Sequence, residues 1–244
     1  MKNNLYTYRF YRETSIPEDL YCYEVKEKES DLLISSGKYL KDLATENLKK
    51  YRSQLEEYIK KDHHFVSALT PYELLDNAPM IARKMQEAGE ICNVGPMAAV
   101  AGAISQFLGE DLLKTTDEVI IENGGDIFIK TKKIRRVAIF SGDTAWKNRL
   151  IFRIEPEQTP LGICTSSGKI GHSLSFGNAD AVAIISESAI LADAVATAVG
   201  NMIKSHHDIP KAINYCKKIK KVKGVAIVKD NHLGIWGEFQ LEEV

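Results

Sequence analysis

Apolar residues follow two different periods along the chain. Near the N-terminus every second residue is apolar, as in Tyr21, Tyr23 and Val25, and this period predicts strands. Residues 41–61 place apolar side chains three and four positions apart, which predicts an amphipathic helix. After residue 118, short apolar runs predict strands over 119–121, 126–129, 137–140, 150–154, 181–185, 225–228 and 235–239.

Proline and glycine mark the ends of the expected helices. Pro79 opens a short helix that Gly89 closes, and Pro96 opens a second helix that Gly109 closes. Two more helices are expected over 188–204 and 210–219. Helices mixed with strands that look antiparallel indicate an α+β fold, an antiparallel β-sheet packed by helices, rather than a doubly wound α/β fold.

The length of 244 residues suits one large domain or two small ones. Because no linker, repeat or low-complexity stretch interrupts the chain, we expect one domain over 1–244. Residues 1–90 form its N-terminal strand and helix portion, and 91–244 carry every site motif. Lysine and arginine number 32 against 33 acidic residues, and this balance argues against a dedicated nucleic-acid binder.

Cysteine spacing and the N-terminal sequence bear on localisation. The four cysteines form no CxxC pair, which suits a reducing compartment, and the first residues lack the apolar stretch of a signal peptide. Residues 91–109 carry no charge, but they contain Pro96 and Gln106 and are flanked by acids. A buried helix is therefore favoured over a membrane span. We expect a cytoplasmic protein without nucleic-acid or membrane partners.

Small residues surround a helix start at 93–103, in the sequence NVGPMAAVAGA. Asn93 and Gly95 precede the helix, where free backbone N–H groups and the helix dipole favour an anion. The alanines and Gly102 let either a flat ligand or a second helix approach the backbone. Both interpretations stay open: a cofactor site at Asn93 and Gly95, or tight helix packing.

The sequence ENGGDI places Asn123, Gly124 and Gly125 between two apolar runs. Asn-Gly and Gly-Gly supply the positive φ that a two-residue hairpin turn needs. A hairpin explains these three residues, but it does not explain the acids Glu122 and Asp126 on either side.

Hydroxyl groups and glycines crowd residues 164–181, which we expect to be a loop. Loops of this composition bind phosphates through backbone N–H groups and hydroxyls. His172 stands between a glycine and a serine, which gives a role in a site as much weight as one in the core. Cys164 fits a small buried apolar residue equally well. The hydroxyl residues directly after Cys164 are Thr165, Ser166 and Ser167.

A single carboxylate interrupts the apolar helix expected at 188–204. Asp193, Thr197 and Asn201 follow one another at intervals of one turn. A carboxylate among Ile, Leu, Val and Ala is costly unless it is paired or binds a cation. Oxygen ligands from Asp193 and Thr197 suit Mg²⁺. The alternative is a helix cap or a polar contact to a strand.

Two further groups of residues receive no role. The histidine pairs at 63–64 and 206–207 lack a third ligand at metal spacing. The basic clusters at 130–136 and 217–223 adjoin apolar strand positions and are typical of solvated sheet edges.

Read in order, the four motifs resemble the ApbE family of flavin transferases. That family carries D-x-G-G-x-A-K-G at a helix start, then N-x-G-G-D, T-S-G, a histidine and A-D-A-x-A-T-A. This chain has NVGPMAAV, ENGGD, CTSSG, His172 and ADAVATA in the same order. The resemblance is closest to a small, poorly characterised branch that carries VGPMAAVAGA, CTSS and GHSLSFG almost unchanged.

The resemblance implies that the protein binds FAD or FMN with Mg²⁺ and moves FMN onto a serine or threonine of an acceptor protein. Asp193 and Thr197 match the family's metal ligands by position, and His172 matches its histidine as an acid–base or orienting group. The matched flavin-contacting positions are Asn123, Gly124, Gly125, Thr165 and Ser166. Asn93, Gly95, Asp126 and Ser167 belong to the same motifs, and we count them as cofactor-binding candidates.

The chain departs from the family at several positions. Ala99 stands where the family has a lysine, Pro96 replaces a glycine and Asn93 replaces an aspartate. SLSFG follows His172 where the family has D-P-x-T-G. A binding module for a flavin or another nucleotide, without chemistry, therefore stands beside the transferase as an alternative. The acceptor protein and a homo-oligomeric state stay open.

A second alternative concerns sulfur. The resemblance to this branch implies a link to sulfide assimilation, towards homocysteine and cysteine, with Cys164 acting as a thiolate or persulfide. Such a thiol must be accessible and partly ionised, because the thiolate is the nucleophile. In a flavin site, Cys164 only packs beneath the loop and stays inert.

Overall fold

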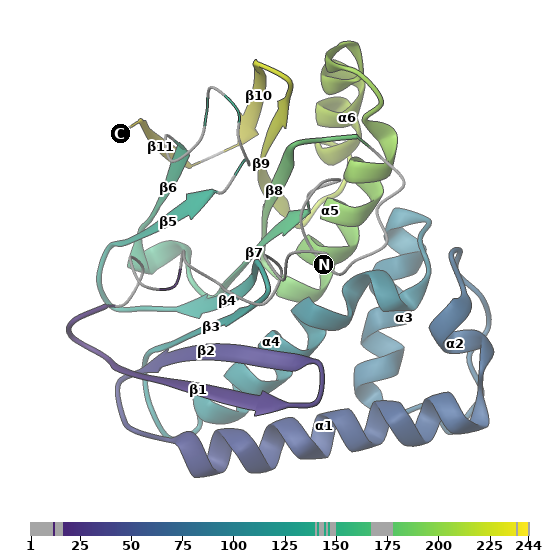
Figure 1. Cartoon of the computed structure of the whole chain (residues 1–244), viewed down its shortest axis with the longest axis vertical. Helices are drawn as coiled ribbons and strands as arrows, with labels where there is room; N and C mark the ends of the chain where they lie inside the picture. Colours follow the sequence, from purple (N-terminus) through teal and green to yellow (C-terminus); the bar gives the residue numbers. More distant parts are fainter. Residues whose placement is uncertain are drawn as a thin grey trace, which may run out of the picture.

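Eight antiparallel strands form the central sheet, in the order β1-β2-β3-β4-β7-β8-β9-β10 (Figure 1). The computed structural model describes residues 12, 17–139, 141, 144, 146, 150–166, 178–237 and 239–243. The strands of the sheet are β1 (Tyr21–Glu27), β2 (Ser30–Ser36), β3 (Val119–Asn123), β4 (Asp126–Lys130), β7 (Leu161–Ser166), β8 (Ala181–Ser186), β9 (Val222–Lys229) and β10 (His232–Gly237).

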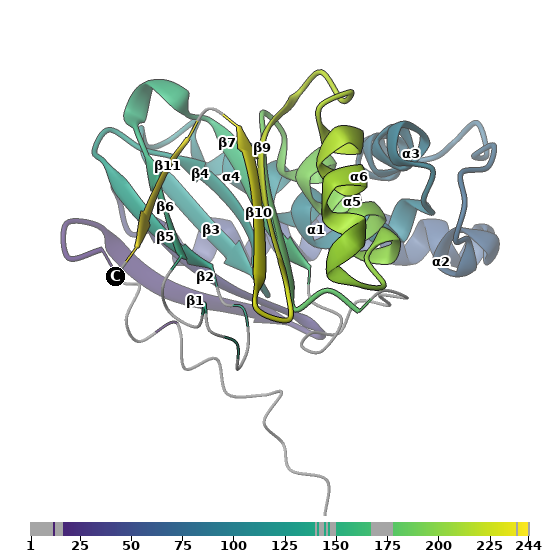
Figure 2. The same cartoon turned by 90° about the horizontal axis from the view of Figure 1, so that it is seen from above.

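Helices cover one face of this sheet, and a small second sheet covers part of the other (Figure 2). The second sheet has the order β11-β6-β5. Its strands are β5 (Arg135–Ile139), β6 (Leu150–Ile154) and β11 (Gln240–Glu243). The helices are α1 (Lys41–Lys61), α2 (His64–Ser67), α3 (Met80–Cys92), α4 (Val100–Leu112), α5 (Ala189–Met202) and α6 (Ile209–Cys216). The α+β fold, with antiparallel sheet packed by helices, is confirmed.

Two apolar cores lie on opposite faces of the central sheet. Val182 and Ile184 of β8 pack in the core under the helices, whereas Ala183 and Ile185 pack in the core under the second sheet. Successive side chains of a strand point to opposite faces, so β8 must be apolar throughout. The N-terminal strands join the helix-side core through Tyr23, Val25, Leu32 and Ile34.

Two predicted helix ends were wrong, because the glycines that predicted them lie inside helices. Helix α3 runs past Gly89 to Cys92, and α4 runs past Gly109 to Leu112. A Cβ at Gly109 would overlap the ring of Phe128, and one at Gly89 would overlap the carbonyl of Val94. Both glycines are therefore sites of close packing rather than helix ends.

Strand β7 corrects the loop expected from residue 164 onward. Cys164, Thr165 and Ser166 are strand residues, paired with β4 on one side and β8 on the other. Five of the six residues of β7 are buried. Burial on both faces removes the alternation of apolar and polar residues by which a strand is identified in a sequence.

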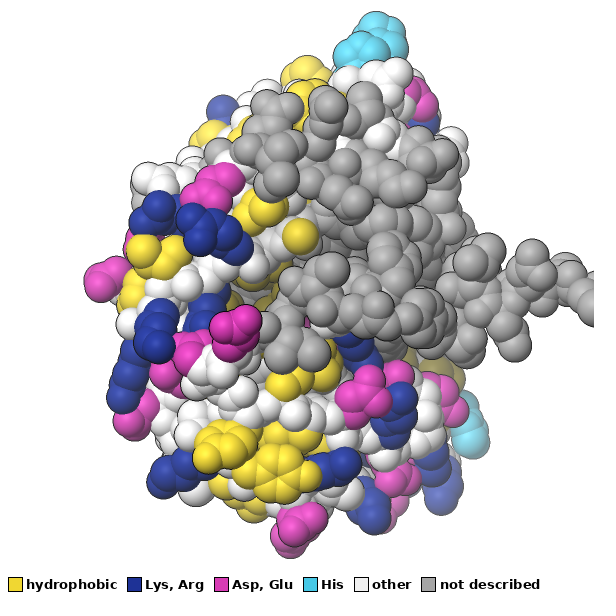
Figure 3. All heavy atoms as spheres, turned by 60° about the vertical axis from the view of Figure 1, so that its left-hand side comes forward, with side chains coloured by type: hydrophobic (Ala, Val, Ile, Leu, Met, Phe, Trp, Pro, Cys, Tyr) yellow, Lys and Arg dark blue, Asp and Glu magenta, His cyan; other side chains and the backbone are white. Residues whose placement is uncertain are grey.

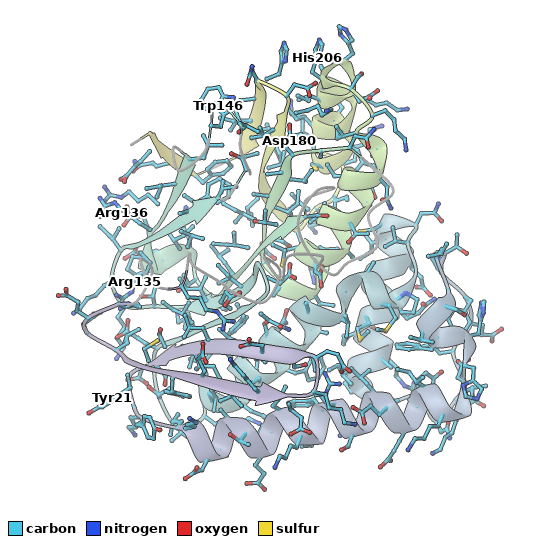
Figure 4. The ribbon with its side chains drawn as sticks, viewed as in Figure 1. Tyr21, Arg135, Arg136, Trp146, Asp180 and His206 are labelled. Carbon is cyan, nitrogen blue, oxygen red and sulfur yellow. The ribbon has the colours of Figure 1, made fainter. Side chains whose placement is uncertain are left out.

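Basic and acidic side chains intermingle on the face of the molecule that Figure 3 shows. The basic cluster at 130–136 forms ion pairs: Lys132 with Asp117 at 2.7 Å, and Arg136 with Glu242 at 2.6 Å. Figure 4 shows Arg135 and Arg136 at the outer side of the second sheet.

Among the described residues, no single helix is long and apolar enough to cross a membrane. Helix α3 passes that test only together with residues 96–112, and the two segments meet at a bend of 102°.

Candidate functional site

The turn between β3 and β4 brings the first polar groups together. Asn123 pairs with Asp126 across the hairpin, and Gly124 and Gly125 form its turn with φ of 70° and 111°. The hairpin expected from ENGGDI is therefore confirmed. The Asn123 amide donates from Nδ2 to the carbonyl of Ala101 at 3.2 Å, which ties the hairpin to the start of α4.

Strand β7 pairs with β4 and places Cys164 and Thr165 next to the hairpin turn. Cys164 pairs with Asp126, and the Thr165 N–H donates to the Gly125 carbonyl at 3.1 Å. Cys164 belongs to the helix-side core, whereas Ile163 belongs to the core on the other face. Because side chains alternate along a strand, Thr165 falls on the face opposite to Cys164.

Helix α5 contacts the start of α4 through the carboxylate of Asp193. Oδ2 of Asp193 accepts a hydrogen bond from the Gly102 N–H at 2.9 Å. This bond supplies a partner for an amide in the first turn of α4, as the helix-cap alternative expects, and a metal ligand at Asp193 stays a prediction. A Cβ at Gly102 would overlap the Ala189 carbonyl, so the small residues of 93–103 serve tight helix packing at this point.

We call the place where these elements meet the four-motif junction, and define it by Ala101, Asn123, Asp126, Cys164 and Asp193. Ser105 also belongs to its frame, because its hydroxyl donates to the carbonyls of Ala101 at 3.0 Å and Asp126 at 3.3 Å. The apposition of ENGGD and CTS that a single site requires is therefore present.

Two carboxyl groups at the four-motif junction influence each other. Burial raises the pKa of Asp126 to about 7, helped by the negative charge of Glu122 and opposed by a hydrogen bond from Cys164. Burial also raises the pKa of Asp193, and the charge of Asp126 adds to this effect, while the amides of Gly102 and Ala101 oppose it. In the part of the chain that the structure describes, no lysine, arginine or histidine shifts either pKa.

Cys164 has the opposite environment to the one that a sulfur relay needs. Its side chain is fully buried, and Sγ lies 3.4 Å from the carbonyl of Ala189. Burial, followed by the charges of Asp126 and Asp193, raises the pKa of the thiol well above its usual value. A sulfur relay needs an accessible, partly ionised thiol, and burial next to two carboxyl groups does not favour one, although the Ile127 N–H partly offsets the rise in pKa.

The polar stripe of α5 is the accessible line of an otherwise buried helix. Asp193, Thr197 and Asn201 are half-buried, whereas nearly all the remaining residues of α5 are buried. Among the described residues, no three His, Cys, Asp or Glu side chains are grouped so as to hold a metal alone. Mg²⁺, however, usually takes one or two carboxylates and completes its shell with water and substrate phosphate. The oxygens of Asp193 and Thr197, with Asp126 near, fit that mode of binding.

The positions before α4 have structural partners. Asn93 ends α3 in the left-handed conformation, with φ of 55°, and the Gly95 N–H donates to the Leu69 carbonyl at 2.9 Å. A Cβ at Gly95 would overlap the carbonyl of Ala68. That amide is therefore not free for an anion, and a cofactor contact at Asn93 or Gly95 stays a prediction. Ser167 and His172 lie outside the described residues.

The family model described as AbpE bacteria matches residues 14–221 of the chain. The chain belongs to this family. A UPF0280 protein of Methanococcus maripaludis (strain C7) is 39% identical over 219 residues, 88% of each chain. A UPF0280 protein of Methanosarcina acetivorans is 40% identical over 200 residues, 81% of this chain and 78% of its own. These relatives agree with the poorly characterised branch that the sequence resembles.

Solved flavin transferases share the fold of this AbpE family member. ApbE from Vibrio cholerae has a TM-score of 0.59 at 11% identity and covers 91% of this chain and 98% of its own. The flavinyl transferase ApbE from Pseudomonas stutzeri has a TM-score of 0.58 at 13% identity, with 90% and 94% covered. The protein therefore has the fold of ApbE flavin transferases.

Sequence reasoning missed two groupings, because their members are far apart in the chain. Arg12 binds Glu122, which lies 110 residues later. His232 stacks on His206 with ring centroids 3.9 Å apart, and His207 lies equally close to His206. Figure 4 shows His206 at the end of the molecule near β10.

Proposed function

We propose that this protein binds FAD at the four-motif junction together with Mg²⁺, and that it carries out flavin-transferase chemistry on the FAD pyrophosphate. The observation that carries the proposal is the pair Asp126 and Asp193: two interacting carboxyl groups whose pKa no described basic residue lowers. Family membership and the shared fold with ApbE flavin transferases support the flavin as the ligand.

Charge explains why a cation belongs in the proposal. A pyrophosphate is an anion, and two carboxylates beside it would repel it. A divalent cation held by Asp193 and Thr197 would offset both charges and stabilise the negative charge that develops on the phosphate oxygens. The Gly102 N–H keeps the Asp193 carboxylate in place, so one of its oxygens is already oriented.

The proposed transfer needs few groups from this chain. An acceptor hydroxyl oxygen forms a bond to the phosphorus on the FMN side of the pyrophosphate, the bond to AMP breaks, and AMP leaves. The hydroxyl proton passes to a base, for which His172 is the predicted residue. Ala99 supplies no positive charge where the family has a lysine. In this proposal the cation alone therefore offsets the negative charge on the phosphate oxygens.

The experiment is an FAD titration, followed by flavin fluorescence, with Mg²⁺ and with a chelator. Wild-type protein is expected to bind FAD at least ~10-fold more tightly with Mg²⁺, equal to one unit of log affinity. Asp193→Asn should lose this dependence, because the amide can still accept the Gly102 hydrogen bond but carries no charge. Asp76→Asn, an exposed aspartate in the loop before α3, is the control and should behave as wild type.

Two results would contradict the proposal. Absence of binding at millimolar flavin would remove the flavin as ligand. Binding without release of AMP, in the presence of serine- and threonine-bearing acceptor peptides, would favour the binding module instead. Sulfur chemistry at Cys164 gains no support from the buried thiol described above.

A further inference from the structure

Arg12 is buried among three acidic residues on the face of the sheet that points away from the helices. Its Nε donates to Oε2 of Glu122 at 2.6 Å. Its Nη1 donates to Oδ1 of Asp31 at 2.8 Å and to Oε1 of Glu24 at 3.2 Å, and Nη2 donates to the carbonyl of Asp31 at 2.8 Å. Only 7% of Arg12 is exposed, and the bond to Glu122 is buried, whereas the Glu24 side chain is 48% exposed.

Glu122 connects Arg12 to the hairpin turn through a second hydrogen bond. One carboxylate oxygen, Oε2, accepts from Arg12, and the other, Oε1, accepts from the Gly125 N–H at 3.2 Å. Gly125 has a φ of 111° and its carbonyl accepts from Thr165, so it lies between the turn and β7. A guanidinium in the N-terminal part of the chain is thus two hydrogen bonds away from the glycine turn.

A lysine could not make the same set of contacts. The planar guanidinium presents several N–H groups at fixed angles, and here Nε binds Glu122 of β3, Nη1 binds Asp31 of β2 and Glu24 of β1, and Nη2 binds the Asp31 carbonyl. The neighbouring Lys26 shares two of the acids, at 3.1 Å from Glu24 and 3.5 Å from Asp31, but it is exposed. Lys26 makes no described ion pair with Glu122.

We propose that Arg12 is a positioning residue for the binding site: it orients the Glu122 carboxylate, and Glu122 holds the Gly124–Gly125 turn in the conformation that receives the ligand. The ligand part of this inference rests on the proposed flavin function. The effect on the turn is independent of it and can be measured without any ligand.

The first measurement is amide hydrogen exchange at Gly125, followed by NMR in the full chain. Arg12→Lys should accelerate exchange at Gly125 ~10-fold relative to amides of β8, because a hydrogen bond to a well-placed charged acceptor contributes about that factor. Arg135→Lys is the matched control. Arg135 also binds an acid near the N-terminus, Asp19, at 2.7 and 3.1 Å, but it does not contact the turn.

The second measurement asks whether Arg12 acts through Glu122. Glu122→Gln keeps an oxygen that can accept from Gly125 and removes the charge that pairs with Arg12. If the path runs through Glu122, adding Arg12→Lys to Glu122→Gln should accelerate exchange at Gly125 no further. Glu122→Gln also tests the proposal should Arg12→Lys fail to fold.

The third measurement is the affinity for FAD in the presence of Mg²⁺. Arg12→Lys should weaken binding ~10-fold, whereas Arg135→Lys should leave it unchanged. Equal acceleration of exchange at all amides, or unchanged exchange at Gly125, would overturn the role of Arg12. A wild type that binds no flavin would overturn the proposed function, while the exchange data would still decide the role of Arg12.

Discussion

At the scale of single residues, Cys164 is a thiol held protonated by its surroundings. It is fully buried next to two carboxyl groups, and its pKa lies well above the usual value. Alkylation with iodoacetamide at pH 8 should therefore modify Cys164 at least ~10-fold more slowly than the half-buried Cys22, because only the thiolate reacts. Mass spectrometry of the alkylated peptides measures both rates.

Denatured protein provides the control for this labelling. Without structure, all four cysteines should react at similar rates, since the burial that raises the pKa is gone. Rapid labelling of Cys164 in the folded protein would restore the sulfur alternative.

Asp126 predicts a dependence of stability on pH. Its pKa is about 7 in the folded protein, against an ordinary value near 3.8, so the folded state binds more protons between these two values. The contribution of this carboxyl is fully present below about pH 4 and is lost as the pH rises towards 7. Asp126→Asn should therefore flatten the decline in unfolding free energy over this range, as measured by denaturant titration at a series of pH values.

The aspartate in the loop before α3 again serves as the control. Asp76→Asn should leave the pH dependence unchanged, because this side chain is exposed. A wild type whose stability increases steadily from pH 4 to 7, with Asp126→Asn behaving identically, would contradict the raised pKa.

At the scale of elements, the contact between α4 and α5 depends on the absence of a side chain at Gly102. A Cβ there would overlap the backbone of Ala189 and approach Cβ of Asp193 to 2.9 Å. Gly102→Ala should lower the free energy of unfolding by about 1–3 kcal/mol, the usual cost of overpacking, and weaken the proposed Mg²⁺-dependent binding as well. Glu110→Ala, on the exposed side of α4, should change neither quantity in chemical denaturation and flavin titration.

Elements with a regular period or an uninterrupted apolar run were predictable from the sequence, whereas strand β7 was not. The spacing of Leu48, Tyr51 and Leu55 identifies α1, since one face of this helix is solvated. Strand β7 has neither signal, because Gly162, Thr165 and Ser166 interrupt its apolar run. Gly109 resembles a helix end in the sequence, and only the ring of Phe128 shows why a glycine stands there.

Some residues of the candidate site could be identified from the sequence, and others could not. Asp193 could be identified from the sequence, because a carboxylate in an apolar helix is conspicuous without knowledge of its partners. The contact between Glu122 and Arg12 could not be predicted: Glu122 stood out beside the hairpin, but its partner lies 110 residues away in the chain. The burial of Cys164 was equally hidden, since it results from helix α5 packing across β7.

At the scale of the whole molecule, the two cores can be perturbed separately. Phe152 is fully buried between the sheets and meets Phe239 with ring centroids 4.6 Å apart. Phe152→Ala should lower the free energy of unfolding by about 3–5 kcal/mol, the usual cost of deleting a buried ring. The affinity for FAD should stay unchanged, because the four-motif junction lies on the other face of the sheet.

Phe152→Leu provides the graded control, with a smaller loss of stability that chemical denaturation should resolve. A loss of flavin affinity in either variant, under conditions where the protein remains folded, would show that the two faces are coupled.

The strand order places the four-motif junction on a seam between two halves of the chain. Strands β1 to β4 come from residues 21–130, and strands β7 to β10 come from residues 161–237. The pair Asp126 and Cys164 crosses the seam, and so does the hydrogen bond from Gly102 to Asp193. Neither half alone contains the four-motif junction, so the junction exists only where β4 pairs with β7 and α4 contacts α5. A bound ligand would therefore bridge segments from both halves, and it should slow the separation of β4 from β7 during unfolding.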